Sequence, residues 1–139
     1  MAIQLMIGIG MIGVTAYVHA WALALATKEL KPITRWAKQR PTHFRLSTAL
    51  SASVVGVMAA HLVEVALWAV GFLALGVFAD METSFYFTLV AYTTLGFGDI
   101  ILPDQRRILS GFVAANGFLI FGWSTAYQVD FLADLRKGF

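Results

Sequence analysis

The sequence of 139 residues contains no cysteine and few charged residues. Without cysteine, the chain has no disulfide, no thiolate metal site and no cysteine nucleophile. Charged residues make up only 13% of the sequence, whereas a soluble domain carries about a quarter. With a hydrophobic content of 59%, this deficit excludes a soluble globular protein. The length allows one domain, so we expect no regulatory domain in the chain.

Three long apolar runs dominate the sequence. A membrane helix needs about 20 mostly apolar residues, and each run is long enough. We therefore predict an all-α membrane protein with spans at 1–27, 46–78 and 107–133. No Lys or Arg precedes the first run, unlike a secretory signal, so we interpret it as a retained extra N-terminal transmembrane helix.

The segment 28–45 between the first two runs is basic, and it holds six of the ten Lys and Arg residues. Its two prolines and Trp36 favour a loop or a surface-lying amphipathic segment. The positive-inside rule places it in the cytoplasm, which puts the N-terminus outside and the C-terminus inside a cell membrane. Arg106 and Arg107 then fall on the outer side and weigh against this orientation. A basic segment this short, beside long apolar runs, does not favour nucleic-acid binding.

A short aromatic segment at 83–93 leads into a glycine loop at 94–99. The segment is too short to cross a bilayer, so it favours a re-entrant or buried helix. Irregular backbone at membrane depth survives only when it is buried in protein or lines a watery cavity. Gly96 and Gly98 alternate with larger residues, and glycine reaches left-handed conformations without a Cβ penalty. Such alternation aims successive carbonyls to one side, where they replace the water shell of a cation.

The string TTLGFGD in this loop resembles the T-V-G-Y-G-D selectivity filter of potassium channels. The preceding SFYFTLVAY resembles the pore helix of that family, and Gly117 lies about where its inner helix carries a hinge glycine. The resemblance implies a pore domain at 46–139, with outer helix 46–78, pore helix 83–93, filter 94–99 and inner helix 107–133. It also implies a homotetramer in the lipid bilayer that conducts K⁺, with no catalysis and no cofactor beyond the transported ion.

The resemblance assigns ion sites to the filter residue by residue. K⁺ would bind the backbone carbonyls of Thr94, Leu95, Gly96 and Phe97, and the Thr94 hydroxyl would complete the innermost site. Gly98 would close the outer mouth. The support residues around the filter would be Thr93, Asp99, Tyr86, Phe87 and Val90.

Two features of the sequence depart from the family pattern. Phe97 replaces the common tyrosine and lacks its hydroxyl, while Tyr86 and Phe87 stand where many members have tryptophans. We therefore expect a filter that is less tightly braced. Val90 stands where some members have a glutamate that pairs with the residue matching Asp99, so that pair is absent.

Three polar residues interrupt the apolar runs, and ionisable groups inside a membrane are candidates for function. His61 and Glu64 are three residues apart and share a helix face, and His19 of the first run can reach a similar depth. Glu64 could simply hydrogen-bond to neighbouring helices or to the back of the pore helix. The cluster could also sense protons, because histidine titrates near neutral pH, or it could bind a metal.

The sequence leaves the function and its control partly open. Alternatives to a potassium channel are a non-selective cation channel on the same fold, a non-conducting scaffold, and a membrane enzyme or metal-binding protein that uses His19, His61 and Glu64. No run carries arginine at every third position, so no voltage sensor is expected. Asp130, beside Tyr127 at the end of the last run, either attracts cations by its field or is a solvated helix end.

Overall fold

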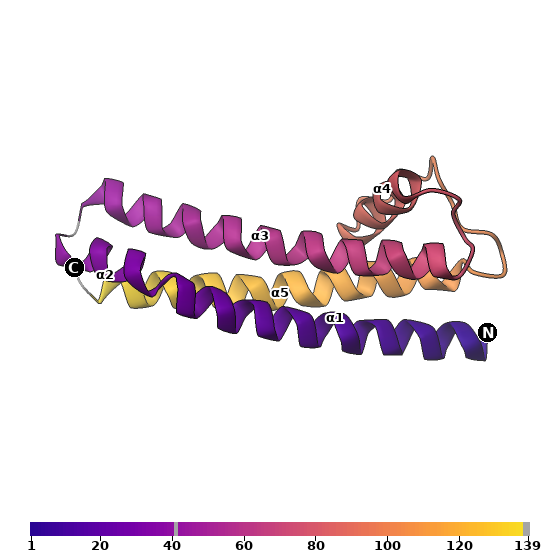
Figure 1. Ribbon diagram of the computed structural model, residues 1–139, viewed down its shortest axis with the longest axis horizontal. Helices are drawn as coiled ribbons and strands as arrows, with labels where there is room; N and C mark the ends of the chain where they lie inside the picture. Colours follow the sequence, from indigo (N-terminus) through magenta and orange to yellow (C-terminus); the bar gives the residue numbers. More distant parts are fainter. Residues whose placement is uncertain (41, 138–139) are drawn as a thin grey trace.

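The computed structural model describes residues 1–40 and 42–137, and within these ranges every regular element is a helix. The helices are α1 (Ala2–Glu29), α2 (Lys31–Gln39), α3 (His43–Ala74), α4 (Met81–Tyr92) and α5 (Ile108–Arg136). Three of them, α1, α3 and α5, are long and apolar enough to cross a membrane. These three run side by side, and the short α4 leans against α3 and α5 at one end of the bundle (Figure 1).

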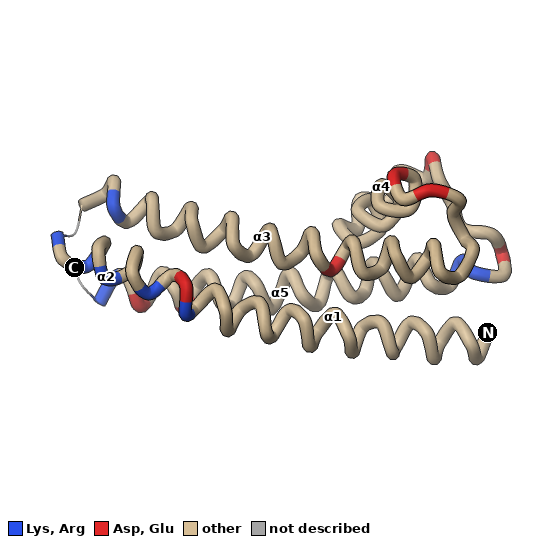
Figure 2. Tube along the Cα trace, in the orientation of Figure 1, with Lys and Arg blue, Asp and Glu red and all other residues tan. Residues whose placement is uncertain are grey.

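Charged residues gather at the two ends of this bundle, and the long middle is almost free of them (Figure 2). Basic residues concentrate at the end that holds α2 and the C-terminus. The expected basic segment 28–45 contains a helix, α2, rather than a continuous loop. Residue 41 of that segment and residues 138–139 of the expected pore domain lie outside the described residues. The N-terminus lies at the opposite end, close to the loops that flank α4.

The ends of α3 and α4 differ from the expected bounds because of two local signals. Gly76 adopts a left-handed conformation with φ of 64°, and its N–H donates to the carbonyl of Leu73 at 2.9 Å. This glycine cap ends α3 at Ala74 rather than at residue 78. The Asp80 carboxylate accepts a hydrogen bond from the N–H of Thr83 at 2.8 Å. That N-cap starts α4 at Met81 rather than at residue 83.

A cluster of large side chains fixes α4 in the groove between α3 and α5. Trp68 and Phe72 of α3 are almost fully buried, as are Phe87 and Tyr92 of α4. Phe87 packs edge-on against Phe72, with ring centroids 5.5 Å apart. Between helices in lipid, such packing stabilises through close contact rather than through removal of apolar surface from water. The cluster therefore fixes where α4 delivers the loop that follows it.

The expected extra helix, α1, packs against both α3 and α5. Gly8 of α1 lies directly against the ring of Phe112, where a Cβ would overlap the ring. Further along, Asn116 Nδ2 donates to Oγ1 of Thr15 at 2.8 Å, and both side chains are fully buried. Buried polar contacts of this kind join helices in membranes. Helix α1 is thus an integral part of the bundle.

Candidate functional site

The loop that follows α4 has an alternating backbone. Thr94, Gly96 and Gly98 have positive φ angles of 60°, 58° and 78°, while Leu95 and Phe97 between them do not. The alternation expected at Gly96 and Gly98 therefore begins two residues earlier, at Thr94. A threonine in this conformation is uncommon and is held by its surroundings. Alternation of this kind turns successive carbonyls of an extended segment toward the same side.

The last carbonyls of α4 hold the start of this loop. The N–H groups of Leu95 and Gly96 both donate to the carbonyl of Val90, at 3.1 and 3.2 Å. The N–H of Thr94 donates to the carbonyl of Ala91 at 2.9 Å. The C-terminal carbonyls of α4, which carry the negative end of its dipole, are therefore directed at the loop. Val90 thus supports the loop through its backbone carbonyl.

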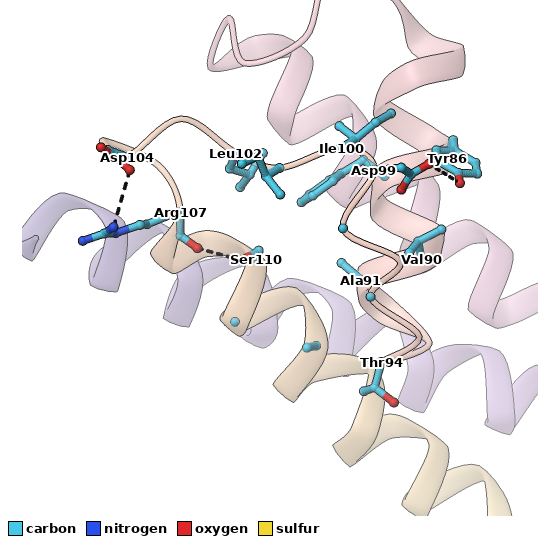
Figure 3. Close-up of a pocket in the computed structure, with 16 residues that line it drawn as sticks. Tyr86, Val90, Ala91, Thr94, Asp99, Ile100, Leu102, Asp104, Arg107 and Ser110 are labelled. Carbon is cyan, nitrogen blue, oxygen red and sulfur yellow. Dashed lines mark hydrogen bonds and ion pairs between the residues drawn. The ribbon is translucent and has the colours of Figure 1, made fainter.

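Residues 93–99 are exposed on the surface of the single chain. The side chains of Leu95 and Phe97 are 58% and 65% exposed. A cavity of about 550 Å³ lies beside the loop, and Figure 3 shows its lining, which includes Val90 and Thr94. Exposed irregular backbone cannot face lipid, so this surface must border water or other protein chains.

A hydrogen bond ties the outer end of the loop to α4. The Tyr86 hydroxyl donates to the Asp99 carboxylate at 2.6 Å (Figure 3). This hydrogen bond lowers the pKa of Asp99 and raises the pKa of Tyr86. Tyr86 therefore supplies Asp99 with the partner that Val90 cannot, while the expectation of a less tightly braced filter at Phe97 stays a prediction. Phe87 faces the core described above, and Thr93 donates its hydroxyl to the carbonyl of Leu89 at 2.8 Å.

Gly117 lies where α5 passes closest to the end of α4. A Cβ at this position would overlap the backbone carbonyl of Tyr92. Glycine is therefore required here for close approach of two backbones. The structure gives this residue a packing role, and its assignment as a hinge stays a prediction.

The three polar residues of the apolar runs meet at the centre of the bundle. Nδ1 of His19 lies 2.7 Å from Oε1 of Glu64, and Nδ1 of His61 lies 3.2 Å from Oε2. His19 and Glu64 have no exposed surface, and His61 is 4% exposed. The prediction that Glu64 bonds to neighbouring helices and to the back of α4 agrees with this geometry, because the Tyr92 hydroxyl also donates to Oε2.

Sequence reasoning missed two members of this cluster, Tyr92 and Ser124. Oγ of Ser124 lies 3.1 Å from Nε2 of His19 and 2.9 Å from Nε2 of His61. A serine within an apolar run carries no distinctive signal, and Tyr92 reads as one more aromatic residue of its helix. The ligand atoms of His19, His61 and Glu64 lie within 4.8 Å of one another, but each already has a hydrogen-bonding partner.

At the far end of α5, Asp130 borders a second cavity, of about 430 Å³. Lys31, Arg35 and Lys38 of α2 line the same cavity. Asp134 also lines this cavity and pairs with Nζ of Lys38 at 2.9 Å. Lys31 and Arg35 are thus the basic residues left to offset the field of Asp130. The proposed attraction of cations by Asp130 alone is therefore weakened by its neighbours.

Comparison with known proteins places these features in a family. Searches among curated proteins and among solved structures returned no match. A family model described as "Ion channel" matches residues 60–134, which is more than half of the 139-residue chain. The match runs from the middle of α3 through α4 and the 94–99 loop to the end of α5. The chain therefore belongs to an ion channel family.

Proposed function

We propose that the chain is a subunit of a potassium-selective channel that conducts through backbone carbonyls of residues 94–97. The alternating backbone of the 94–99 loop carries this proposal. A cation that leaves water needs oxygen ligands in place of its hydration shell, and aligned carbonyls supply them without a fixed negative charge. Membership of an ion channel family supports the same function.

The exposure of the loop in the single chain supports a homotetramer. One extended segment presents carbonyls to one side of an ion only, and four copies around an axis enclose it. Large apolar side chains of α5 also remain exposed on the single chain, among them Phe118 at 72% and Leu119 at 61%. Contacts between copies, and the lipid around them, would cover these surfaces. The basic α2 end would face the cytoplasm under the positive-inside rule.

A second candidate is a non-selective cation channel on the same fold. Phe97 favours it, because a phenyl ring cannot form the hydrogen bond that a tyrosine hydroxyl would provide behind the carbonyls. The Tyr86–Asp99 bond favours potassium selectivity, because it restrains the outer end of the loop. An enzyme or a metal-binding protein built on His19 would leave the alternating loop without a role.

Ion flux into liposomes that hold the purified protein tests the proposal. We expect flux down a K⁺ gradient and little under an equal Na⁺ gradient. Gly96→Ala should abolish it, because alanine at the positive φ of this residue is disfavoured by about 1–2 kcal/mol and shifts the carbonyls. Gly56→Ala, at an open helical position, is the matched control and should conduct normally.

The other outcomes discriminate between the candidates. Equal flux of K⁺ and Na⁺ would select the non-selective channel. Absence of flux for both ions, in protein that remains folded and tetrameric, would contradict conduction. Orientation is tested separately, because the chain lacks cysteine: Ala2→Cys should be labelled from outside the cell and Gln39→Cys from inside.

A further inference from the structure

Three helices, α1, α3 and α5, contribute to one closed ring of buried polar side chains. Starting from Glu64, the contacts run to His19, on to Ser124, then to His61 and back to Glu64. We call these four residues the side-chain ring. Tyr92 of α4 joins it from outside, because its hydroxyl donates to Oε2 of Glu64 and also lies 3.3 Å from Nδ1 of His61, whose single N–H is shared between these two oxygens when it donates. The ring is at most 5% exposed at any member, so water does not substitute for a missing bond.

The number of protons in this ring can be counted. The ring has four contacts, and each needs one proton to be a hydrogen bond. A neutral imidazole carries one N–H and serine carries one O–H, so two neutral histidines and Ser124 supply three. The Tyr92 proton is used in its own bond to Glu64. With an ionised Glu64, one contact therefore lacks a proton.

The tautomers of the two histidines decide where the missing bond falls. If both imidazoles donate from Nδ1 to the carboxylate, both Nε2 lone pairs face the single hydroxyl of Ser124. One additional proton, taken from water, repairs this arrangement. It can reside on a histidine, which then donates from Nε2 to Oγ of Ser124, or on Glu64, which then donates to His19. Both placements satisfy every contact and leave the ring with no net charge, which is the less costly state inside a membrane.

We propose that the side-chain ring binds one exchangeable proton and that this proton controls conduction through Tyr92. This proposal rests on the proposed channel function. Tyr92 is fully buried and ends α4, one residue before Thr93 and two before Thr94 of the loop. Its hydroxyl is bonded to the ring, and its backbone carbonyl lies against Gly117 of α5. A change in the ring therefore acts on the residue that leads into the conducting loop.

The surroundings of the ring contain no competing charge. Helix α1 presents His19, α3 presents His61 and Glu64, and α4 presents Tyr92. Helix α5 adds Ser124 and the aromatic rings of Phe121 and Trp123. Within the described part of the chain, no lysine, arginine or aspartate bonds to a ring member. Gain or loss of this proton is thus the only change of charge expected at the ring.

Nuclear magnetic resonance of the wild-type ring tests the proton count without reference to conduction. The chain has three histidines, and a His43→Gln background leaves only His19 and His61. The nitrogen shifts of the two imidazoles and the carbon shift of the Glu64 carboxyl report the protonation state of these three groups. At neutral pH we expect one proton beyond two neutral imidazoles and a carboxylate, and we expect the ring to lose this proton as the pH is raised.

Potassium flux at the same pH values tests the coupling. We expect flux to fall at least about fivefold as the ring loses its proton, the low end of couplings between sites. Tyr92→Phe should keep the titration of the ring but remove the pH dependence of flux. His61→Gln should remove both. Thr15→Val, which breaks a buried α1–α5 contact without a titratable group, is the matched control and should keep both.

Each of the other possible results would contradict one named part of the proposal. Two neutral imidazoles with an ionised carboxylate near neutral pH, or no titration at all, would overturn the proton site. Retention of pH-dependent flux in Tyr92→Phe would overturn the coupling through Tyr92. One Zn²⁺ per chain after dialysis, lost in His61→Gln, would replace the proton site by a metal centre. A titrating ring in a protein that conducts no K⁺ would instead reject the proposed channel function and leave the proton site standing.

Discussion

The 94–99 loop and the side-chain ring are the two candidate functional regions of the protein, and they are built in opposite ways. The loop presents backbone and is exposed along its whole length in the single chain. The ring consists of side chains, is closed to water, and is complete in a single chain. Under the proposed function the loop needs further copies to enclose an ion, whereas the ring satisfies its own hydrogen bonds when it holds the one extra proton proposed above.

This difference predicts that the ring contributes more to the free energy of unfolding, and that the loop contributes more to the proposed conduction. Buried polar groups are costly when a partner is removed, so the ring should dominate the stability of the single chain. Exposed backbone in a loop contributes little to that stability, but under the proposed function its geometry decides whether an ion is bound. Substitutions in the two regions should therefore separate stability from conduction.

Removal of the carboxylate should have the largest effect. Glu64→Leu leaves His19, His61 and Tyr92 buried without their common partner, and breaking a buried pair in this way costs about 3–5 kcal/mol. The midpoint of thermal unfolding in detergent should fall accordingly. Glu82→Leu, an exposed position on α4, is the control and should change little. Equal effects of the two variants would mean that the ring does not stabilise the chain.

Substitution at the junction of the two regions should have an intermediate effect. Gly117→Ala forces α5 away from the Tyr92 carbonyl, and overpacking of this kind costs about 1–3 kcal/mol. Thermal unfolding measures it. Gly122→Ala on the same helix meets nothing within 4 Å and should slightly stabilise the helix, by roughly 0.5–1 kcal/mol. If Gly117→Ala is equally harmless, the residue serves as a hinge or as a neutral position rather than as a close contact.

Loss of the brace at the loop should have the smallest effect on stability and a clear effect on the loop. Tyr86→Phe removes the hydroxyl that lowers the pKa of Asp99, so that pKa should rise. Because the wild-type carboxylate stays ionised to lower pH, the brace is present above the ordinary pKa of aspartate and is lost as pH falls through the lowered value. In the variant, the carboxyl of Asp99 should protonate at higher pH.

The carbon shift of the Asp99 carboxyl measures this change directly. Tyr17→Phe, an exposed tyrosine on α1, is the control and should leave the titration of Asp99 unchanged. An unchanged Asp99 titration in Tyr86→Phe would show that the brace does not persist in solution. The K⁺ to Na⁺ flux ratio of the same variant would then reveal whether the brace contributes to selectivity.

Much of the fold could be predicted, and the reasons are local. The lengths of the apolar runs fixed the three long helices, and the glycine spacing indicated an alternating loop. The ends of α3 and α4 were missed by a few residues because caps at Gly76 and Asp80 were not weighed against the apolar runs. The cluster of His19, His61 and Glu64 could be suspected because ionisable residues are rare in membranes.

The amino-acid sequence by itself determined a helical membrane protein and a loop with the pattern of an ion-selective filter, because both depend on short stretches of neighbouring residues. Only the tertiary structure decided that Ser124 and Tyr92 complete the cluster, that Tyr86 holds Asp99, and that Gly117 meets the end of α4. The long helices are apolar all round, so no amphipathic stripe states which face turns inward. Their rotation about their own axes, and hence every contact between them, is set by packing among distant parts of the chain.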